Sequence, residues 1–290
     1  MLLPLTCALL LTAAADEKRP AYPRAELLIE VSELMRPEAT RRFHLLDTRG
    51  KEKYEAGHIP GAVAVNTLSW SKAFAASPDA ETWGKHLAAV GIRNTEMPVV
   101  VYGDDPREAA RVWWILHYWG LKDVRLLNGG WQAWEAAKGP VSKETVTPAA
   151  GPGIKLTPVT ERNATKSFLL EAVKGKTHQI LDVRSTQEYC GETESAKRNG
   201  AIPGAVHLEW SEVLDPKSKR FKPPEELTRL FQDAGIDPSR PTATYCQSGG
   251  RAAVMAFTLE LMGGKEVRNY YRSWAEWGNA DDTPIVKPKK

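Results

Sequence analysis

The stretch Tyr245-Cys246-Gln247-Ser248-Gly249-Gly250-Arg251-Ala252-Ala253 decides how the rest of the sequence is interpreted. The β-prone run 242–245 leads into it. The run 252–262 that follows is typical of a helix and ends at two glycines. We therefore expect Cys246 at the end of a strand, in a tight turn that opens a helix.

The neighbours of Cys246 favour a reactive cysteine. Glycines permit positive φ angles, so the N–H groups of the loop can converge on one point and form an anion-binding nest. The helix N-terminus adds partial positive charge, and Arg251 adds a full one. A cysteine in that field is expected to be largely thiolate near neutral pH. We predict that Cys246 is a nucleophile whose anionic adduct is held by the amides of residues 247–251; a buried structural cysteine is the alternative.

Composition indicates a soluble globular protein. The 290 residues are 42% hydrophobic and 26% charged, which allows two domains of ordinary size, each with its own core. A net charge of +3 gives no case for nucleic-acid binding. The six histidines are scattered and no Cys-x-x-Cys occurs, so we expect no metal site, no nucleotide loop and no cofactor.

Residues 1–11 are apolar apart from Thr6, and three alanines follow at 13–15, which favours a secretory signal at 1–15, cleaved near Ala15. The run is too short to span a bilayer. We expect an exported protein, periplasmic or secreted, without a membrane segment after cleavage; a cytoplasmic protein is the alternative. Cleavage would leave Cys190 and Cys246, which is too few for a disulfide framework.

The chain repeats itself. An apolar run ending in Asp-x-Arg occurs twice, at 45–49 and 180–184, and an Ile-Pro-Gly-Ala-Val turn occurs at 59–63 and 202–206. Tyr102-Gly103 matches Tyr245-Cys246, and the Trp-x-x-Trp segment at 131–134 has a related Trp-x-x-Trp at 274–277. The second half carries eight extra residues between its Asp-x-Arg and its Ile-Pro-Gly turn. Two copies of one domain explain this pattern.

Each copy alternates short apolar strands with helical runs, which predicts an α/β fold with a mainly parallel sheet and helices on both faces. In the first copy, strands are expected at 43–46, 62–65, 99–102 and 124–127, and helices at 107–118 and 131–137. We divide the chain into a first domain at 22–140, a linker at 141–158 and a second domain at 159–285. Active sites in such folds lie at the carboxyl ends of the strands, where Cys246 falls.

These motifs together resemble the tandem rhodanese-type sulfurtransferases, over roughly residues 24–284. The resemblance implies two rhodanese-like domains, of which the second is catalytic and the first has lost its cysteine. Gly103 occupies the position that matches Cys246, and Asp104 and Asp105 follow it. Two carboxylates there would repel an anion, so the first copy is also a poor anion site on physical grounds.

By resemblance, the reaction moves a sulfane sulfur from an anionic donor, thiosulfate or 3-mercaptopyruvate, to cyanide or a thiol through a persulfide on Cys246. The residues expected to bind the donor and the persulfide are Arg184, Gln247, Ser248, Gly249, Gly250 and Arg251. Arginine suits such donors because its N–H groups form a planar fork. For Arg184, a structural role as the partner of Asp182 or of a neighbouring carboxylate is the alternative.

The donor is less clearly indicated. Gln247 brings no charge where the thiosulfate type has arginine, while Ser248 matches the mercaptopyruvate type. The second carboxylate-binding arginine of that type is missing. Lys197 and Arg198 in the expanded segment are candidates to replace it. We favour thiosulfate, because a compact dianion asks less of the pocket.

Three alternatives stay open. A persulfide carrier would load sulfur and deliver it to a partner protein without rapid turnover. A cysteine phosphatase shares the amide-lined thiolate, but its loop is Cys-x5-Arg, whereas Cys246 and Arg251 are separated by four residues. Cys190, in the expanded segment, is either a lone thiol or a redox partner of Cys246. The oligomeric state is not indicated.

Overall fold

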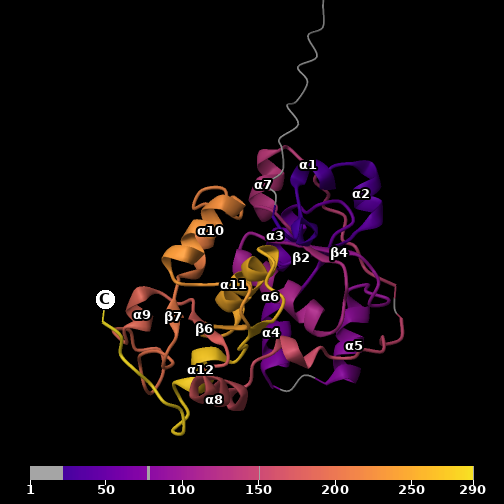
Figure 1. Cartoon of the computed structure of the whole chain (residues 1–290). Helices are drawn as coiled ribbons and strands as arrows, with labels where there is room; N and C mark the ends of the chain where they lie inside the picture. The colour runs from indigo at the N-terminus through magenta and orange to yellow at the C-terminus, as the bar shows by residue number, and fades with distance from the viewer. Residues whose placement is uncertain (1–21, 77–78, 150, 290) are drawn as a thin grey trace, which may run out of the picture.

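The computed structural model describes residues 22–76, 79–149 and 151–289; the proposed signal at 1–15 lies outside these ranges. The two halves form two α/β domains that lie side by side (Figure 1). In each domain every strand pair is parallel. The predicted fold class is therefore confirmed.

The first sheet has the order β1-β5-β4-β2-β3 and the second has the order β7-β6-β8-β9. The strands of the first are β1 (Leu28–Ile29), β2 (His44–Asp47), β3 (Val63–Ala64), β4 (Val99–Tyr102) and β5 (Val124–Leu127). Those of the second are β6 (Gln179–Asp182), β7 (Val206–His207), β8 (Thr242–Tyr245) and β9 (Val267–Asn269). The strand β1 has its counterpart in a single bridge between Asn163 and Asn269.

The first domain contains the helices α1 (Val31–Leu34), α2 (Pro37–Arg42), α3 (Lys51–Ala56), α4 (Thr67–Ala76), α5 (Ala80–Ala89), α6 (Pro106–Tyr118) and α7 (Gly130–Ala136). The second contains α8 (Lys166–Gly175), α9 (Thr186–Tyr189), α10 (Pro224–Asp233), α11 (Gly250–Leu261) and α12 (Ser273–Trp277). Short 3-10 turns lie at Ala25–Leu27, Thr160–Arg162 and Trp210–Val213. The strands predicted at 99–102, 124–127 and 242–245 have those bounds, and the two predicted first-domain helices each begin one residue earlier.

Alternation along the strands sends side chains to two different cores. In β4, Val99 and Val101 belong to one cluster, while Val100 and Tyr102 belong to another on the opposite face. In β8, Ala243 and Tyr245 face the second domain's own cluster. Cys246, the next residue, belongs to the cluster on the other face. The strand period therefore points Cys246 toward the first domain.

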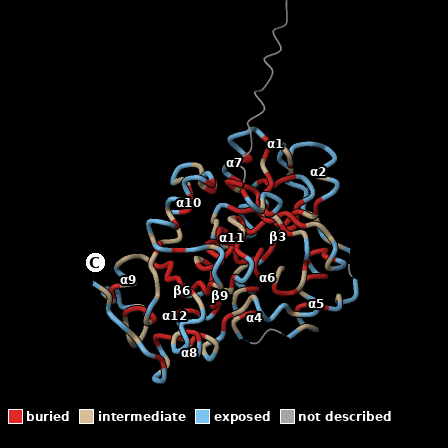
Figure 2. Tube along the Cα trace, in the orientation of Figure 1, coloured by how far each residue is buried: buried red, intermediate tan, exposed pale blue. Residues whose placement is uncertain are grey.

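The largest core is shared between the domains. Helices α6 and α11 lie against each other in the middle of the molecule, where buried residues concentrate (Figure 2). Trp113 of α6 meets Phe257 of α11 edge to face, with ring centroids 4.9 Å apart. Trp114 stacks on Tyr271 at 5.4 Å. The expectation that each domain has its own core is thus incomplete, because the largest cluster spans both.

The predicted linker contains no helix or strand in its described residues and runs over the first domain. Ser142 pairs with His58 and Ile154 donates to the carbonyl of Gly84, while Val159, the first residue after the predicted linker, donates to the carbonyl of Tyr118. These bonds bind the segment to the first domain along its length.

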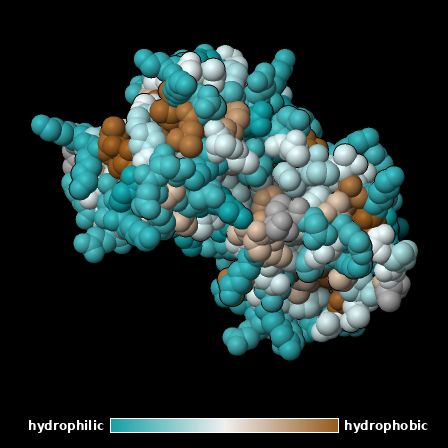
Figure 3. Space-filling view, turned by 90° about the horizontal axis from the view of Figure 1, so that it is seen from below, coloured by the Kyte–Doolittle hydropathy of each residue, from teal (hydrophilic) through white to brown (hydrophobic). Residues whose placement is uncertain are grey.

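The outer surface in the view of Figure 3 is mostly hydrophilic, with small separate hydrophobic patches. Within the ranges that the structure describes, no helix combines the length and apolar character needed to cross a membrane.

Candidate active site

Cys246 follows directly after β8, and a short loop carries the chain from it into α11. The sulfur Sγ accepts a hydrogen bond from the N–H of Gly249 at 3.1 Å. The backbone N–H of Cys246 donates to Oγ of Ser273 at 3.0 Å, and that hydroxyl donates to the carbonyl of Tyr270 at 2.6 Å. The thiol is thus placed at a strand end, as the sequence predicts, and the amide of Gly249 is directed at it. The convergence of the other amides of residues 247–251 stays a prediction.

A cavity of about 310 Å³ reaches Cys246. Its lining consists of Arg107, Glu108, Arg111, Cys246, Gln247, Ser248, Gly250 and Arg251. Cys246 itself is 1% exposed, so a reactant meets it through this cavity and not on the open surface. A small, cation-rich cavity around a buried sulfur suits a compact anion.

The cavity lies between the first turns of two helices, α6 from the first domain and α11 from the second. Each helix is long enough to carry a macrodipole, with its positive end near the cavity. The side chain of Asp105 caps α6, whereas no side chain caps α11, which begins directly after the loop 246–249. The field at Cys246 therefore has contributions from both domains.

The two glycines of the loop are needed for different reasons. Gly249 has a φ of +84°, and a Cβ there would lie 2.7 Å from the carbonyl oxygen of Tyr271. Gly250 needs no special φ angle, but a Cβ there would lie 2.5 Å from Nη2 of Arg111. The first glycine permits the turn, and the second admits a side chain of the other domain.

Arg251 lies in the cavity wall as predicted, with a partner that the sequence interpretation missed. It forms two hydrogen bonds to Glu188, at 2.6 and 2.8 Å. Burial alone would raise the pKa of Glu188, but the hydrogen bonds from Arg251 and Ser185 lower it to about 2. Glu188 is therefore ionised and neutralises much of the Arg251 charge.

Arg184 does not line the cavity, and the prediction that it holds the donor is wrong. Its side chain is fully buried, and its guanidinium forms hydrogen bonds to Asp182 and to the carbonyl of Gly200. Its carbon Cζ lies 4.3 Å from the ring centroid of Trp274. Since Tyr245 also donates to Asp182, the Asp-x-Arg motif anchors the strand behind the catalytic loop. The structural alternative is the one observed.

The expanded segment packs beside the loop without adding charge to the cavity. The side chain of Gln247 donates to the carbonyl of Ser195 at 2.9 Å. Arg198 is occupied by hydrogen bonds to Ala280 and Thr283, so it cannot serve as the missing carboxylate-binding arginine. Lys197 is exposed and absent from the cavity lining. Cys190 is a buried free thiol outside that lining.

At the corresponding position of the first domain, a side chain would collide with Thr48. A Cβ on Gly103 would lie 2.1 Å from Oγ1 of Thr48. Asp104, the next residue, is paired with Lys53 at 2.5 Å, and Asp105 is paired with Arg107. Carboxylates thus stand where the second domain has its catalytic loop, and the expectation of a poor anion site agrees with this geometry.

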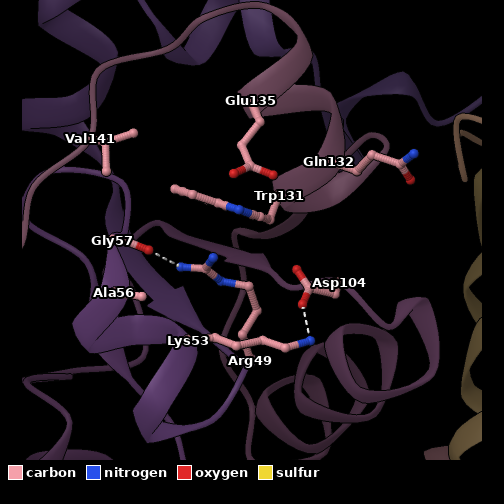
Figure 4. A pocket seen from close by; sticks show the side chains of 9 residues that line it. All are labelled: Arg49, Lys53, Ala56, Gly57, Asp104, Trp131, Gln132, Glu135 and Val141. Carbon is pink, nitrogen blue, oxygen red and sulfur yellow. Dashed lines mark hydrogen bonds and ion pairs between the residues drawn. The ribbon is translucent and has the colours of Figure 1, made fainter.

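The first domain has instead a separate cavity of about 530 Å³, shown in Figure 4. Arg49 lies under the ring of Trp131, with Cζ 3.7 Å from the centroid, and Glu135 lies on the other side of that ring. In the second domain Gly278 matches Glu135, and a Cβ there would touch Ala196 of the expanded segment at 2.7 Å. The expanded segment therefore packs against the second-domain position that matches Glu135, a residue of the cavity lining in the first domain.

The sequence interpretation missed several residues of the site: Arg107, Glu108, Arg111, Glu188 and Ser273. The first three come from the other domain, so only the strand alternation that directs Cys246 toward it could have indicated them. For Ser273 the sequence carries a signal, because a serine stands where the first copy has Gly130. Both residues have a positive φ angle, +51° and +55°. Within residues 22–76, 79–149 and 151–289, no group of three His, Cys, Asp or Glu side chains is arranged to hold a metal ion.

Comparison with known proteins agrees with this geometry. The family model of the rhodanese-like domain matches twice, at residues 30–137 and 165–280. The chain is 34% identical over 264 residues to the thiosulfate sulfurtransferase of Azotobacter vinelandii, covering 89% of this chain and 96% of the relative. It is 36% identical over 252 residues to the sulfur carrier protein TtuD of Thermus thermophilus, covering 81% and 87%.

Among solved structures, the anaerobic ergothioneine biosynthesis enzyme from Chlorobium limicola, in complex with trimethyl histidine, superposes with a TM-score of 0.83. The identity is 23%, over 93% of this chain and 72% of the other, which shows the shared fold alone. The two family matches and the curated relatives show more: the chain belongs to the rhodanese family. It is a sulfurtransferase with two rhodanese-like domains.

The structural role of Arg184 can be tested by Arg184→Gln. Removing one partner of a buried ion pair leaves Asp182 uncompensated, and we expect a loss of about 3–5 kcal/mol in the free energy of unfolding. Arg49→Gln is the matched control, because Arg49 makes the same contacts with Asp47 and Trp131. Urea unfolding measures both. Unchanged stability together with a raised KM for the donor would restore the donor-binding role.

The Arg251–Glu188 pair predicts a pH dependence of stability. The pKa of Glu188 lies below its ordinary value of 4.5, so its contribution is fully present above pH 4.5 and is lost as pH falls toward 2. We expect wild type to be more stable than Glu188→Gln above pH 4.5, by a difference that narrows as the solution is acidified. Urea midpoints across this range give the result. A difference that stays constant on acidification would contradict the pairing.

Proposed function

We propose that the protein transfers the outer sulfur of thiosulfate to cyanide or a thiol through a persulfide on Cys246. The observation that carries the proposal is the position of Cys246: its sulfur borders the cation-rich cavity and accepts the amide hydrogen of Gly249 at 3.1 Å. The names of the sulfurtransferase relatives from Azotobacter vinelandii and Pseudomonas aeruginosa support the same donor.

In the first step, the Cys246 thiolate attacks the outer sulfur of thiosulfate. An Sγ–S bond forms, the S–S bond of thiosulfate breaks, and sulfite leaves with the electron pair. In the second step, cyanide attacks the terminal sulfur, and Sγ leaves as thiolate while thiocyanate forms. A thiol acceptor would instead take the sulfur as its own persulfide. Because the two substrates react in turn, ping-pong kinetics are expected.

The loop supplies the stabilisation that these steps require. The terminal sulfur carries negative charge once it is bound to Cys246. The N–H groups of residues 247–251 would hold it, and the hydroxyl of Ser248, which lines the cavity, is a further donor. Donors fixed in place by the turn need no reorganisation during the reaction.

We favour thiosulfate over 3-mercaptopyruvate because the expanded segment adds no cationic side chain to the cavity. Neither Lys197 nor Arg198 belongs to its lining, so the expanded segment offers no second cation for a carboxylate. A donor comparison on purified protein tests this preference, and a higher kcat/KM for 3-mercaptopyruvate would reverse it.

A sulfur carrier is the second candidate function. The 36% identity to TtuD, a protein named as a sulfur carrier, favours it specifically. A carrier would load Cys246 once and turn over slowly without its partner protein, whereas an enzyme would sustain steady-state turnover with thiosulfate and cyanide. Steady-state kinetics therefore separate the two.

We also propose that the chain is exported, on the composition of residues 1–15. Expression of the full sequence followed by fractionation and N-terminal sequencing tests this proposal. A mature protein that begins near residue 16 and lies outside the cytoplasm supports it. An unprocessed protein in the cytoplasm would show the alternative to be right.

The persulfide assignment predicts that Cys246→Ser abolishes thiosulfate:cyanide turnover, since serine cannot accept the sulfur. Cys190→Ser is the matched control and should largely spare turnover, because Cys190 lies outside the cavity lining. Intact mass after thiosulfate treatment should show one added sulfur in wild type and Cys190→Ser, and none in Cys246→Ser. Retained turnover in Cys246→Ser would refute the assignment.

A further inference from the structure

The charges that line the catalytic cavity are unequally compensated. Three arginines and one glutamate face it. Arg251 is held by Glu188 through two hydrogen bonds, and Arg107 is held by Asp105 in the same two-pronged manner, at 2.9 and 2.6 Å. Both guanidinium groups therefore have a carboxylate directly against them.

Arg111 differs from these two. Its Nη1 donates to neutral acceptors, the carbonyl of Ser248 at 2.7 Å and the hydroxyl of Tyr271 at 3.1 Å. Its contact with a carboxylate, Glu108, is a single approach of 3.4 Å from Nε, which is not a hydrogen bond. The residue is 7% exposed. Among the described residues that line the cavity, Arg111 is the arginine that lacks a hydrogen-bonded carboxylate.

The guanidinium of Arg111 lies against the loop that carries Cys246. A Cβ added to Gly250, the first residue of α11, would lie 2.5 Å from Nη2 of Arg111. Burial works to lower the pKa of Arg111, but Tyr271, Glu108 and the Cys246 sulfur all act to raise it, and the pKa is raised. Arg111 therefore stays charged in the same cavity as Cys246.

We propose that Arg111, a residue of the domain without a cysteine, binds the anionic end of the sulfur donor at the catalytic site of the other domain. The inference rests on the proposed function and adds the residue that recognises the donor. A guanidinium whose Nη1 is fixed by the loop presents its remaining N–H groups to a sulfonate in a defined direction. Glu108 in the same cavity would repel a second anionic group, which restricts the donor to one compact anion.

The test uses the full chain and the alkylation rate of Cys246. Iodoacetate is anionic and iodoacetamide is its neutral analogue, so the ratio of their rates at Cys246, followed by mass spectrometry of its peptide, reports anion binding in the cavity. Loss of a charged hydrogen-bond donor in Arg111→Gln should lower this ratio by about tenfold or more. Arg111→Lys, which keeps the charge, should retain most of the ratio.

Arg125→Gln is the matched control, because it removes a first-domain arginine paired with Asp123 and outside the cavity lining. Its ratio should equal that of wild type. Arg107→Gln should lower the ratio less than Arg111→Gln, since Asp105 already neutralises Arg107. Thermal unfolding identifies any variant that is misfolded, and a purely structural role of Arg111 would slow both reagents alike and leave the ratio unchanged.

Steady-state kinetics separate this inference from the proposed function. If wild type turns over thiosulfate, Arg111→Gln should raise its KM more than it lowers kcat. If wild type shows no such turnover but the alkylation ratio still falls in Arg111→Gln, thiosulfate is the wrong donor and Arg111 remains the anion-binding residue. An unchanged ratio in Arg111→Gln, or an equal fall in Arg125→Gln, would overturn the inference.

Discussion

The packing of α6 against α11 is the constraint on which the active site depends. Trp113 and Phe257 meet within a core that both domains share, so the two helices are fixed relative to each other. Their first turns border the cavity that contains Cys246. The contact from Arg111 to the Ser248 carbonyl then joins the first domain to the catalytic loop itself. Through this packing the first domain, which has Gly103 where the second has Cys246, supplies side chains to the lining of the cavity.

The duplicated Asp-x-Arg motif supports both domains in the same way. Asp47 and Asp182 each accept hydrogen bonds from the arginine two residues later and from the tyrosine that ends the neighbouring strand. The arginine lies against a tryptophan in each copy. The Asp-x-Arg contacts are the same in both copies, whereas the loops that follow Tyr102 and Tyr245 differ. In the first copy the carboxylates that follow Gly103 form ion pairs, and in the second copy the thiol of Cys246 borders the cavity.

Much of the fold and the position of Cys246 can be predicted from the sequence. Strand alternation, the repeat and the turn chemistry around Cys246 are local patterns, and they gave β8, the helix that follows it and the left-handed Gly249. The role of Arg184 could not be decided in this way, because a guanidinium beside a strand end suits an anionic ligand or Asp182 equally well. Arg111 and Glu188 lie far from Cys246 along the chain. Their approach to the site depends on how α6 and α9 pack, which no short pattern records.

The most direct measurement is a crystal structure of the protein after treatment with thiosulfate. The account predicts one additional sulfur atom on Sγ of Cys246, inside the cavity, within hydrogen-bond reach of the loop amides and beside Arg111. An unmodified Cys246, or an added sulfur on Cys190 instead, would contradict the claim that this loop holds the transferred sulfur.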